Sequence, residues 1–164
     1  MHPHRIIDLI AWVTLAAVII GGMAALAWTW GMKFDACPVQ DLNEAQKVAV
    51  AELVDVAKWI LMLSVGLIGL FSSVALGFKE GPKLRKAGWI LLIASMFCFG
   101  FAAYFSLMWR TGVAEAFYNG CPGQVAAARL QVRFDVLTYL FLAGIGILAA
   151  ILCLIVHERW WSRQ

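Results

Sequence analysis

The sequence predicts an all-α integral membrane protein, on the basis of its composition, four long apolar segments and a repeated loop motif. Of its 164 residues, 63% are hydrophobic and 14% are charged, and the mean hydropathy is +0.82. Soluble domains have about 25% charged and about 45–50% apolar residues, so a chain of this length could not bury so much apolar surface in water. The lipid bilayer is therefore the expected solvent, and in lipid only helices and closed barrels satisfy their backbone groups.

Four apolar segments are long enough to cross the bilayer as helices. They cover Ile6–Trp30, Trp59–Phe78, Trp89–Trp109 and Val136–Val156, and each reaches the ~20 residues that span a hydrocarbon core of ~30 Å. Barrel strands would alternate apolar and polar residues over ~10 positions, and these segments do not alternate. The first apolar core is longer than the ~7–15 residues of a signal peptide, so we expect a transmembrane helix there as well.

A short motif occurs twice, in the loops that follow the first and third segments. Residues 37–40 read CPVQ and residues 121–124 read CPGQ. A duplicated helical hairpin explains this pattern, with one repeat over 6–78 and the other over 88–160. Two hairpins that enter the membrane in the same direction relate by a pseudo-twofold axis along the membrane normal. We expect them to form a single four-helix transmembrane domain over residues 1–164.

The cysteines of the two motifs are predicted to form a disulfide. Cys37 and Cys121 are equivalent positions of the repeat, and equivalent residues near a twofold axis can meet. Both loops are expected on the outer side of the membrane, in an oxidising compartment. The alternative is a pair of unrelated free thiols. By loop-closure entropy the bond would stabilise the fold by roughly 4 kcal/mol.

The second and fourth helices are predicted to extend beyond the outer membrane face. Asp41-Leu42-Asn43-Glu44 resembles a capping box, and a helix over Leu42–Phe78 would be about 55 Å long at 1.5 Å per residue. Pro122 suits the first turn of a helix, so the fourth helix is expected from Pro122 to about Trp160. We expect the extensions to form a solvated helical collar, and the alternative is that their charges pair across the two hairpins. The residues concerned are Glu52, Asp55, Arg129, Arg133 and Asp135.

The distribution of basic residues predicts the orientation of the chain. Residues 1–5, 79–87 and 157–164 hold seven basic residues in 22 positions, whereas the loops 31–58 and 110–135 hold six in 54. Because basic residues favour the cytoplasmic side, we expect a multi-pass protein of a bacterial inner (plasma) membrane with both termini in the cytoplasm. Inner basic residues that could contact lipid headgroups or a partner are Lys79, Lys83, Arg85, Lys86 and Arg159. This charge pattern does not suggest nucleic-acid binding.

Small and aromatic residues predict how the helices pack and where they meet the membrane surfaces. Small residues let helices approach closely in lipid, and the predicted contact positions are Gly21, Gly69, Ser73, Gly77 and Gly146. Tryptophans at the segment ends are typical of an aromatic belt. We place Trp28, Trp30, Trp59 and Trp109 at the outer boundary, and Trp89, Trp160 and Trp161 at the inner one.

The search for chemistry gives few candidates. No Asp, Glu, Lys, Arg or His lies near the midpoint of any span, where proton relays and ion-coupled transporters place such residues. Asp8 is interpreted as a capping residue at the positive end of the first helix. The histidines His2, His4 and His157 all lie on the predicted inner side, and no phosphate-loop, nucleophile or zinc motif occurs. We predict no catalytic residue, no metal and no cofactor, and we allow for bound lipids.

Three functions fit these observations, in the following order. The first is a non-enzymatic accessory or structural subunit that packs against other membrane protein subunits in a larger complex. The second is an oligomeric channel or carrier for a small solute, lined by Thr14, Ser64, Ser72, Ser73, Ser95, Ser106 and Thr138. The third is a membrane thiol-disulfide oxidoreductase. Such enzymes need a closely spaced Cys-x-x-Cys pair, whereas each loop here has one cysteine, and Cys98 and Cys153 lie in the third and fourth helices.

Overall fold

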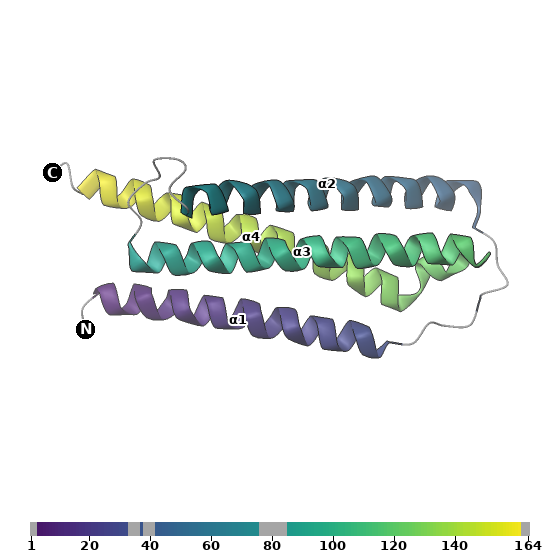
Figure 1. Ribbon diagram of the computed structural model, residues 1–164, viewed down its shortest axis with the longest axis horizontal. Coiled ribbons are helices and arrows are strands. Elements are labelled where there is room, and N and C mark those ends of the chain that lie inside the picture. The colour runs from purple at the N-terminus through teal and green to yellow at the C-terminus, as the bar shows by residue number, and fades with distance from the viewer. Residues whose placement is uncertain (1–2, 33–36, 38–41, 76–84, 162–164) are drawn as a thin grey trace.

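The computed structural model describes residues 3–32, 37, 42–75 and 85–161, which form four long helices and one short 3₁₀-helix (Figure 1). The elements are α1 (Pro3–Gly31), α2 (Glu44–Ala75), α3 (Lys86–Tyr118), η1 (Pro122–Ala126) and α4 (Ala128–Trp161). Each of the four α-helices is apolar enough and long enough to cross a membrane. The predicted class, an all-helical chain with four candidate membrane spans, is confirmed.

The helices alternate in direction, so the bundle has two distinct ends (Figure 1). α1 and α3 begin, and α2 and α4 end, at what we call the terminal end. At the opposite end, the Sγ atoms of Cys37 and Cys121 lie 2.03 Å apart in a disulfide, and we call this the disulfide end. The predicted pairing of these cysteines is confirmed. The side of the membrane that each end faces stays a prediction.

α3 is the central helix of the bundle. α1, α2 and α4 each pack against it, whereas α1 and α2 have scarcely any contact with each other. In the most apolar 18-residue stretch of α3, 50% of the residues are buried inside the bundle. The corresponding fractions are 11% in α1, 17% in α2 and 11% in α4. The two predicted hairpins therefore do not pack alike, because α3 and α4 form the most extensive helix pair while α1 and α2 lie apart. The duplication itself stays a prediction.

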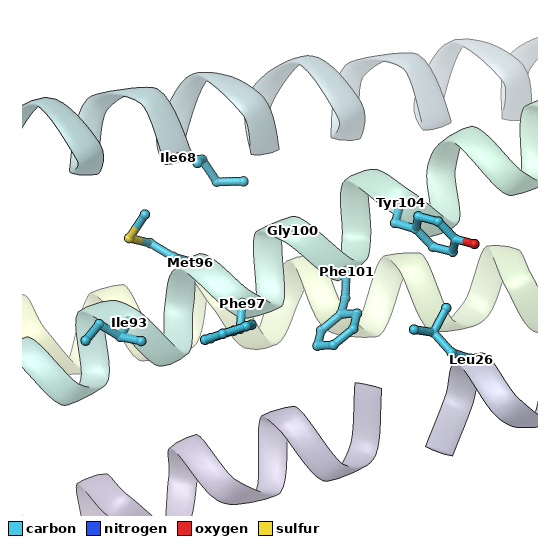
Figure 2. Close-up of a pocket in the computed structure, with 8 residues that line it drawn as sticks. All are labelled: Leu26, Ile68, Ile93, Met96, Phe97, Gly100, Phe101 and Tyr104. Atoms are coloured by element: carbon cyan, nitrogen blue, oxygen red, sulfur yellow. The ribbon is translucent and has the colours of Figure 1, made fainter. Parts of the chain in front are cut away.

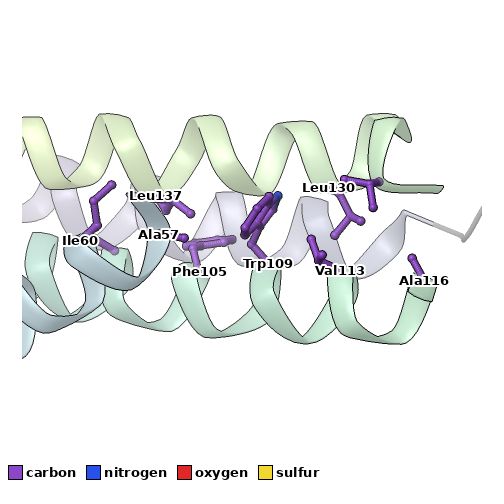
Figure 3. Close-up of a cluster of buried hydrophobic side chains, with 10 residues drawn as sticks. Ala57, Ile60, Phe105, Trp109, Val113, Ala116, Leu130 and Leu137 are labelled. Carbon is purple, nitrogen blue, oxygen red and sulfur yellow. The ribbon is translucent and has the colours of Figure 1, made fainter. Parts of the chain in front are cut away.

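Two apolar clusters form the interior. The first lies in the half nearer the disulfide end, where α2, α3, η1 and α4 meet around Phe105 and Trp109 (Figure 3). The second lies in the half nearer the terminal end, where α1 and α4 meet the first turns of α3. Trp109 was predicted to belong to an aromatic belt at the outer membrane boundary, but the structure buries it among the helices instead of exposing it as an anchor. Its side chain is 2% exposed, and its ring centroid lies 5.2 Å from that of Phe134, so it is a core residue.

The start of α2 has a capping box two residues later than predicted. The backbone N–H of Gln46 donates to Oδ1 of Asn43 at 2.8 Å, and the backbone N–H of Asn43 donates to Oε1 of Gln46 at 2.9 Å. This reciprocal pair satisfies two amides that the first turn leaves without helical partners. The cap is therefore Asn43 rather than Asp41, and Asp41 lies outside the described residues.

The turn between α3 and α4 depends on Gly120 and Pro122. Gly120 has a φ of +68°, and the N–H of Cys121 donates to the carbonyl oxygen of Ala116 at 2.9 Å. A glycine in this left-handed conformation ends a helix and reverses the chain direction. Pro122 then opens η1 rather than α4, and the extended backbone of Ala127 separates the two helices. The prediction that α4 begins at Pro122 is therefore corrected to Ala128.

Three of the helices are much longer than the hydrocarbon core. α2, α3 and α4 have 32, 33 and 34 residues, or about 48–51 Å each at 1.5 Å per residue, compared with a core of ~30 Å. The continuation of α3 from Trp109 to Tyr118 was not predicted, because Arg110, Thr111 and Glu115 were read as part of a loop.

Candidate functional site

A groove of about 580 Å³ lies between α1 and α2, with α3 as its floor (Figure 2). The Tyr104 hydroxyl is the only polar side-chain group of its lining, and Gly100 leaves its floor open because a Cβ there would meet nothing within 4 Å. α1 and α2 contribute one residue each and α3 contributes six. The lining residues are Leu26, Ile68, Ile93, Met96, Phe97, Gly100, Phe101 and Tyr104.

The two walls of the groove are fixed to α3 by different contacts. Gly22 of α1 has no room for a Cβ, because the ring of Phe101 occupies that position. On α2, the carbonyl oxygen of Ala57 accepts a hydrogen bond of 2.6 Å from Oγ of Ser106. Both Ala57 and Ser106 are fully buried. The groove is open because α1 and α2 are attached to separate faces of α3.

The third contact of α3 is with α4 and uses the same kind of bond. Oγ of Ser95 donates to the carbonyl oxygen of Gly144 at 3.1 Å. A Cβ on Gly144 would lie 2.9 Å from Cε1 of Phe99, which is itself fully buried. Glycine therefore permits the close approach of the two helices, as small residues do in membrane helix pairs.

These bonds also locate several of the residues that we considered as the lining of a channel. Ser95 and Ser106 are fully buried between helices, and their hydroxyl groups bond backbone carbonyls of neighbouring helices. Thr14, Ser73 and Thr138 donate to carbonyl oxygens of their own helices. Ser64 is also buried. The hydroxyl groups of Ser95 and Ser106 thus contribute to helix pairing, and those of Thr14, Ser73 and Thr138 are satisfied within their own helices. These positions give the channel hypothesis no support from geometry.

Arg133 is a charged side chain buried near the disulfide end, where an exposed collar residue was predicted. Its side chain is 2% exposed. Nη1 donates to the carbonyl oxygen of Met108 at 3.4 Å, while Nε and Nη2 have no hydrogen-bond partner among the described residues. The prediction was wrong because Gly112 leaves space on α3, where a Cβ would lie 3.6 Å from Nη1 of Arg133. A buried cation with so few partners is costly in an apolar environment.

Arg133→Met is expected to raise the free energy of unfolding by about 1–4 kcal/mol, since apolar replacement of a poorly paired buried charge removes its desolvation cost. Detergent-titration unfolding of the purified protein measures the change. Arg129→Met is the matched control one turn earlier, and it is expected to bring a smaller gain because Arg129 is only half-buried and has interaction partners. A loss of stability in Arg133→Met would contradict this account of Arg133.

A second hollow, of about 450 Å³, lies between the disulfide-end halves of α2 and α4. Trp109 and Phe134 belong to its apolar side, and Gln46, Gln131 and Asp135 add polar groups. Asp135, predicted as a collar residue, is exposed here as expected. The hollow therefore offers both hydrogen-bonding groups and apolar surface to a bound molecule.

The remaining cysteines are far from the disulfide. Cys98 is buried in α3 and Cys153 is exposed on α4, both as free thiols. From Cys98 to the end of α3 at Tyr118 the helix rises about 30 Å. Neither free thiol is placed to exchange directly with the Cys37–Cys121 pair, so the structure gives the oxidoreductase hypothesis no relay.

The predicted lipid-contact residues are only partly described. Arg85 and Lys86 are exposed at the beginning of α3, at the terminal end. Arg5 is exposed in the first turn of α1, at the same end. Lys79, Lys83 and the side chain of Arg159 lie outside the described residues. The predicted contact residues that the structure describes, Arg85 and Lys86, therefore lie with Arg5 at the terminal end of the bundle.

The predicted packing glycines face outward. A Cβ on Gly21, Gly69 or Gly146 would meet nothing within 4 Å. Ser73 donates to Leu70 of its own helix at 2.7 Å, and Gly77 lies outside the described residues. Within this chain the close helix contacts are instead made by Gly22, Gly112 and Gly144. Contact of the outward glycines with another protein stays a prediction.

Among the described residues, no group of three or more His, Cys, Asp or Glu side chains is arranged to hold a metal ion. No protein family matches this chain, and no curated protein or solved structure matches it at a significant level.

Proposed function

We propose that this protein is a non-enzymatic accessory subunit that packs against a larger membrane protein complex. The observation that supports it best is the outward position of Gly21 on α1, Gly69 on α2 and Gly146 on α4. In lipid, small residues bring backbones close enough for van der Waals contact between helices. Glycines that are not used inside the bundle are therefore available to a helix of a partner.

The arrangement of the bundle is consistent with this role. α3 is pinned to α2 and α4 by buried Ser–carbonyl bonds, and the disulfide ties the loop after α1 to the turn after α3. The outer faces of α1, α2 and α4 remain mostly uncovered. A firm frame with three uncovered faces suits a subunit that docks sideways in the membrane. In this proposal the terminal end faces the cytoplasm of a bacterial inner membrane.

The proposal is tested by purification from native membranes in a mild detergent. The wild-type chain is expected to co-elute with a stoichiometric membrane protein. Gly69→Leu is expected to lose this partner while keeping its thermal stability, because the added side chain enters open space in the isolated chain. Gly100→Leu is the matched control, since Gly100 is also open but lies in the groove.

Two results would refute the accessory role. The first is a wild-type chain that elutes alone from native membranes. The second is purified protein that conducts a solute in liposomes by itself, which would instead support a channel.

A further inference from the structure

We propose that the groove between α1 and α2 binds an acyl chain of an anionic phospholipid, whose headgroup lies beside Lys86 at the terminal end. The inference does not rest on the proposed accessory function. It combines the shape and polarity of the groove with the charges that lie in line with it.

The size of the groove fits a lipid chain. Its 580 Å³ lies within the ~300–1,000 Å³ that is common for small-ligand sites. From Ile93 to Tyr104 the floor is about 16 Å long, which suits an extended acyl chain. The lining is apolar except for one hydroxyl, which suits a hydrocarbon chain.

The floor of the groove continues to a cation. Lys86, Trp89, Ile93, Phe97 and Gly100 recur at spacings of three and four on α3, so they share one face of the helix. All of them are exposed or half-exposed. From Trp89 to Gly100 the helix rises about 16 Å, which is close to half of the ~30 Å hydrocarbon core. A lipid with its headgroup at Lys86 therefore has a chain of the right reach for the groove.

The charges at this end favour an anionic headgroup. Arg5, Arg85 and Lys86 are exposed cations at this end. The positive ends of α1 and α3 lie there beside the negative ends of α2 and α4, so the preference comes from the side chains. Among the side chains that the structure describes at this end, Asp8 supplies the opposing charge. Because the cations outnumber it, a phosphate that carries a net negative charge is favoured over a zwitterionic headgroup.

The test is native mass spectrometry of the delipidated full-length protein with equal amounts of phosphatidylglycerol and phosphatidylcholine of identical acyl chains. We expect one tightly held phosphatidylglycerol in the wild type. Gly100→Leu is expected to lose it, since a Cβ there meets no protein atom within 4 Å and the leucine side chain would occupy the floor of the groove. Lys86→Gln is expected to lower the preference for phosphatidylglycerol by about fivefold, the effect of one basic residue near an anionic surface.

Gly69→Leu and Lys58→Gln are the controls, and both should retain the lipid with wild-type preference. Equal retention in wild type and Gly100→Leu would overturn the groove as the site. Equal binding of both lipids to the wild type would overturn the anionic headgroup. A wild-type dimer that Gly100→Leu abolishes would overturn the lipid in favour of a second copy of the chain. Gly69→Leu should lose the partner protein but retain the lipid. The lipid inference and the accessory role can therefore fail independently of each other.

Discussion

Gly144→Leu is expected to lower the free energy of unfolding by about 3 kcal/mol, whereas Gly146→Leu on the same helix should leave it nearly unchanged. A Cβ on Gly144 would lie 2.9–3.2 Å from three atoms of the Phe99 ring. That ring is fully buried and packs edge-on against Phe141 with centroids 5.8 Å apart, so it cannot swing away at low cost. Overpacking of a well-packed core typically costs ~1–3 kcal/mol, and separation of the helices would also weaken the Ser95–Gly144 bond.

The comparison of the two variants isolates the packing effect. Both replace glycine with leucine in one helix, so the difference in helix propensity between glycine and leucine cancels. Gly146 faces open space. Unfolding by a titrated denaturing detergent, followed by tryptophan fluorescence, gives the two free energies. Equal values for Gly144→Leu and Gly146→Leu would contradict the α3–α4 contact.

Gly144 and Gly146 show why the sequence predicted where the helices lie but not which face of a helix points into the bundle. Four apolar segments separated by polar loops indicate four spans whatever their neighbours are. Within Gly144-Ile145-Gly146, however, both glycines occur in an equally apolar setting. Lipid is as apolar as a protein core, so the hydrophobic pattern does not tell which glycine points inward. The prediction therefore selected Gly146, while the structure places Gly144 against α3.

Trp109 and Arg133 illustrate a related limit. Tryptophan near the end of an apolar segment is typical of a membrane boundary, and Arg133 falls in the predicted extension of the fourth helix beyond the membrane. We therefore expected both side chains outside the core. Both are buried because α3 continues for two further turns beyond Trp109 and presents Gly112 to α4. Gly112, which lies one helical turn after Trp109, could have indicated a close contact between α3 and α4. That interpretation required the knowledge that residues 110–118 are helical.

The central position of α3 also has a partial explanation in the sequence. Its buried residues include small and hydroxyl side chains between the large apolar ones, among them Ser95, Ala102 and Ser106. Serine can bond a carbonyl of a neighbouring helix, and alanine lets that helix approach. The groove follows from this arrangement, because α1 and α2 attach to different faces of α3 and leave the Ile93–Tyr104 face between them uncovered. The attachment of α1 and α2 to different faces of α3 thus accounts both for the packing of the bundle and for the candidate lipid site.

Cys121→Ser is expected to lower the free energy of unfolding by up to about 4 kcal/mol. The bond closes a loop across a sequence separation of 84 residues, and chain entropy gives roughly that value for so long a loop. The value is an upper one, because the membrane already restricts the conformations of the unfolded chain. The disulfide therefore removes less entropy from that chain than it would in water.

The controls for Cys121→Ser are the other cysteine variants and the reduced wild-type protein. Cys37→Ser, the double variant and the reduced wild type should all match Cys121→Ser, because each removes the same bond and the effects of coupled residues do not add. Cys153→Ser, which replaces an exposed free thiol, should behave as the wild type. Unfolding is measured by detergent titration with and without dithiothreitol. An accessory subunit should still bind its partner after the bond is removed, since the helix contacts of α3 remain. A wild type whose stability does not respond to reduction would show that the Cys37–Cys121 bond does not stabilise the bundle.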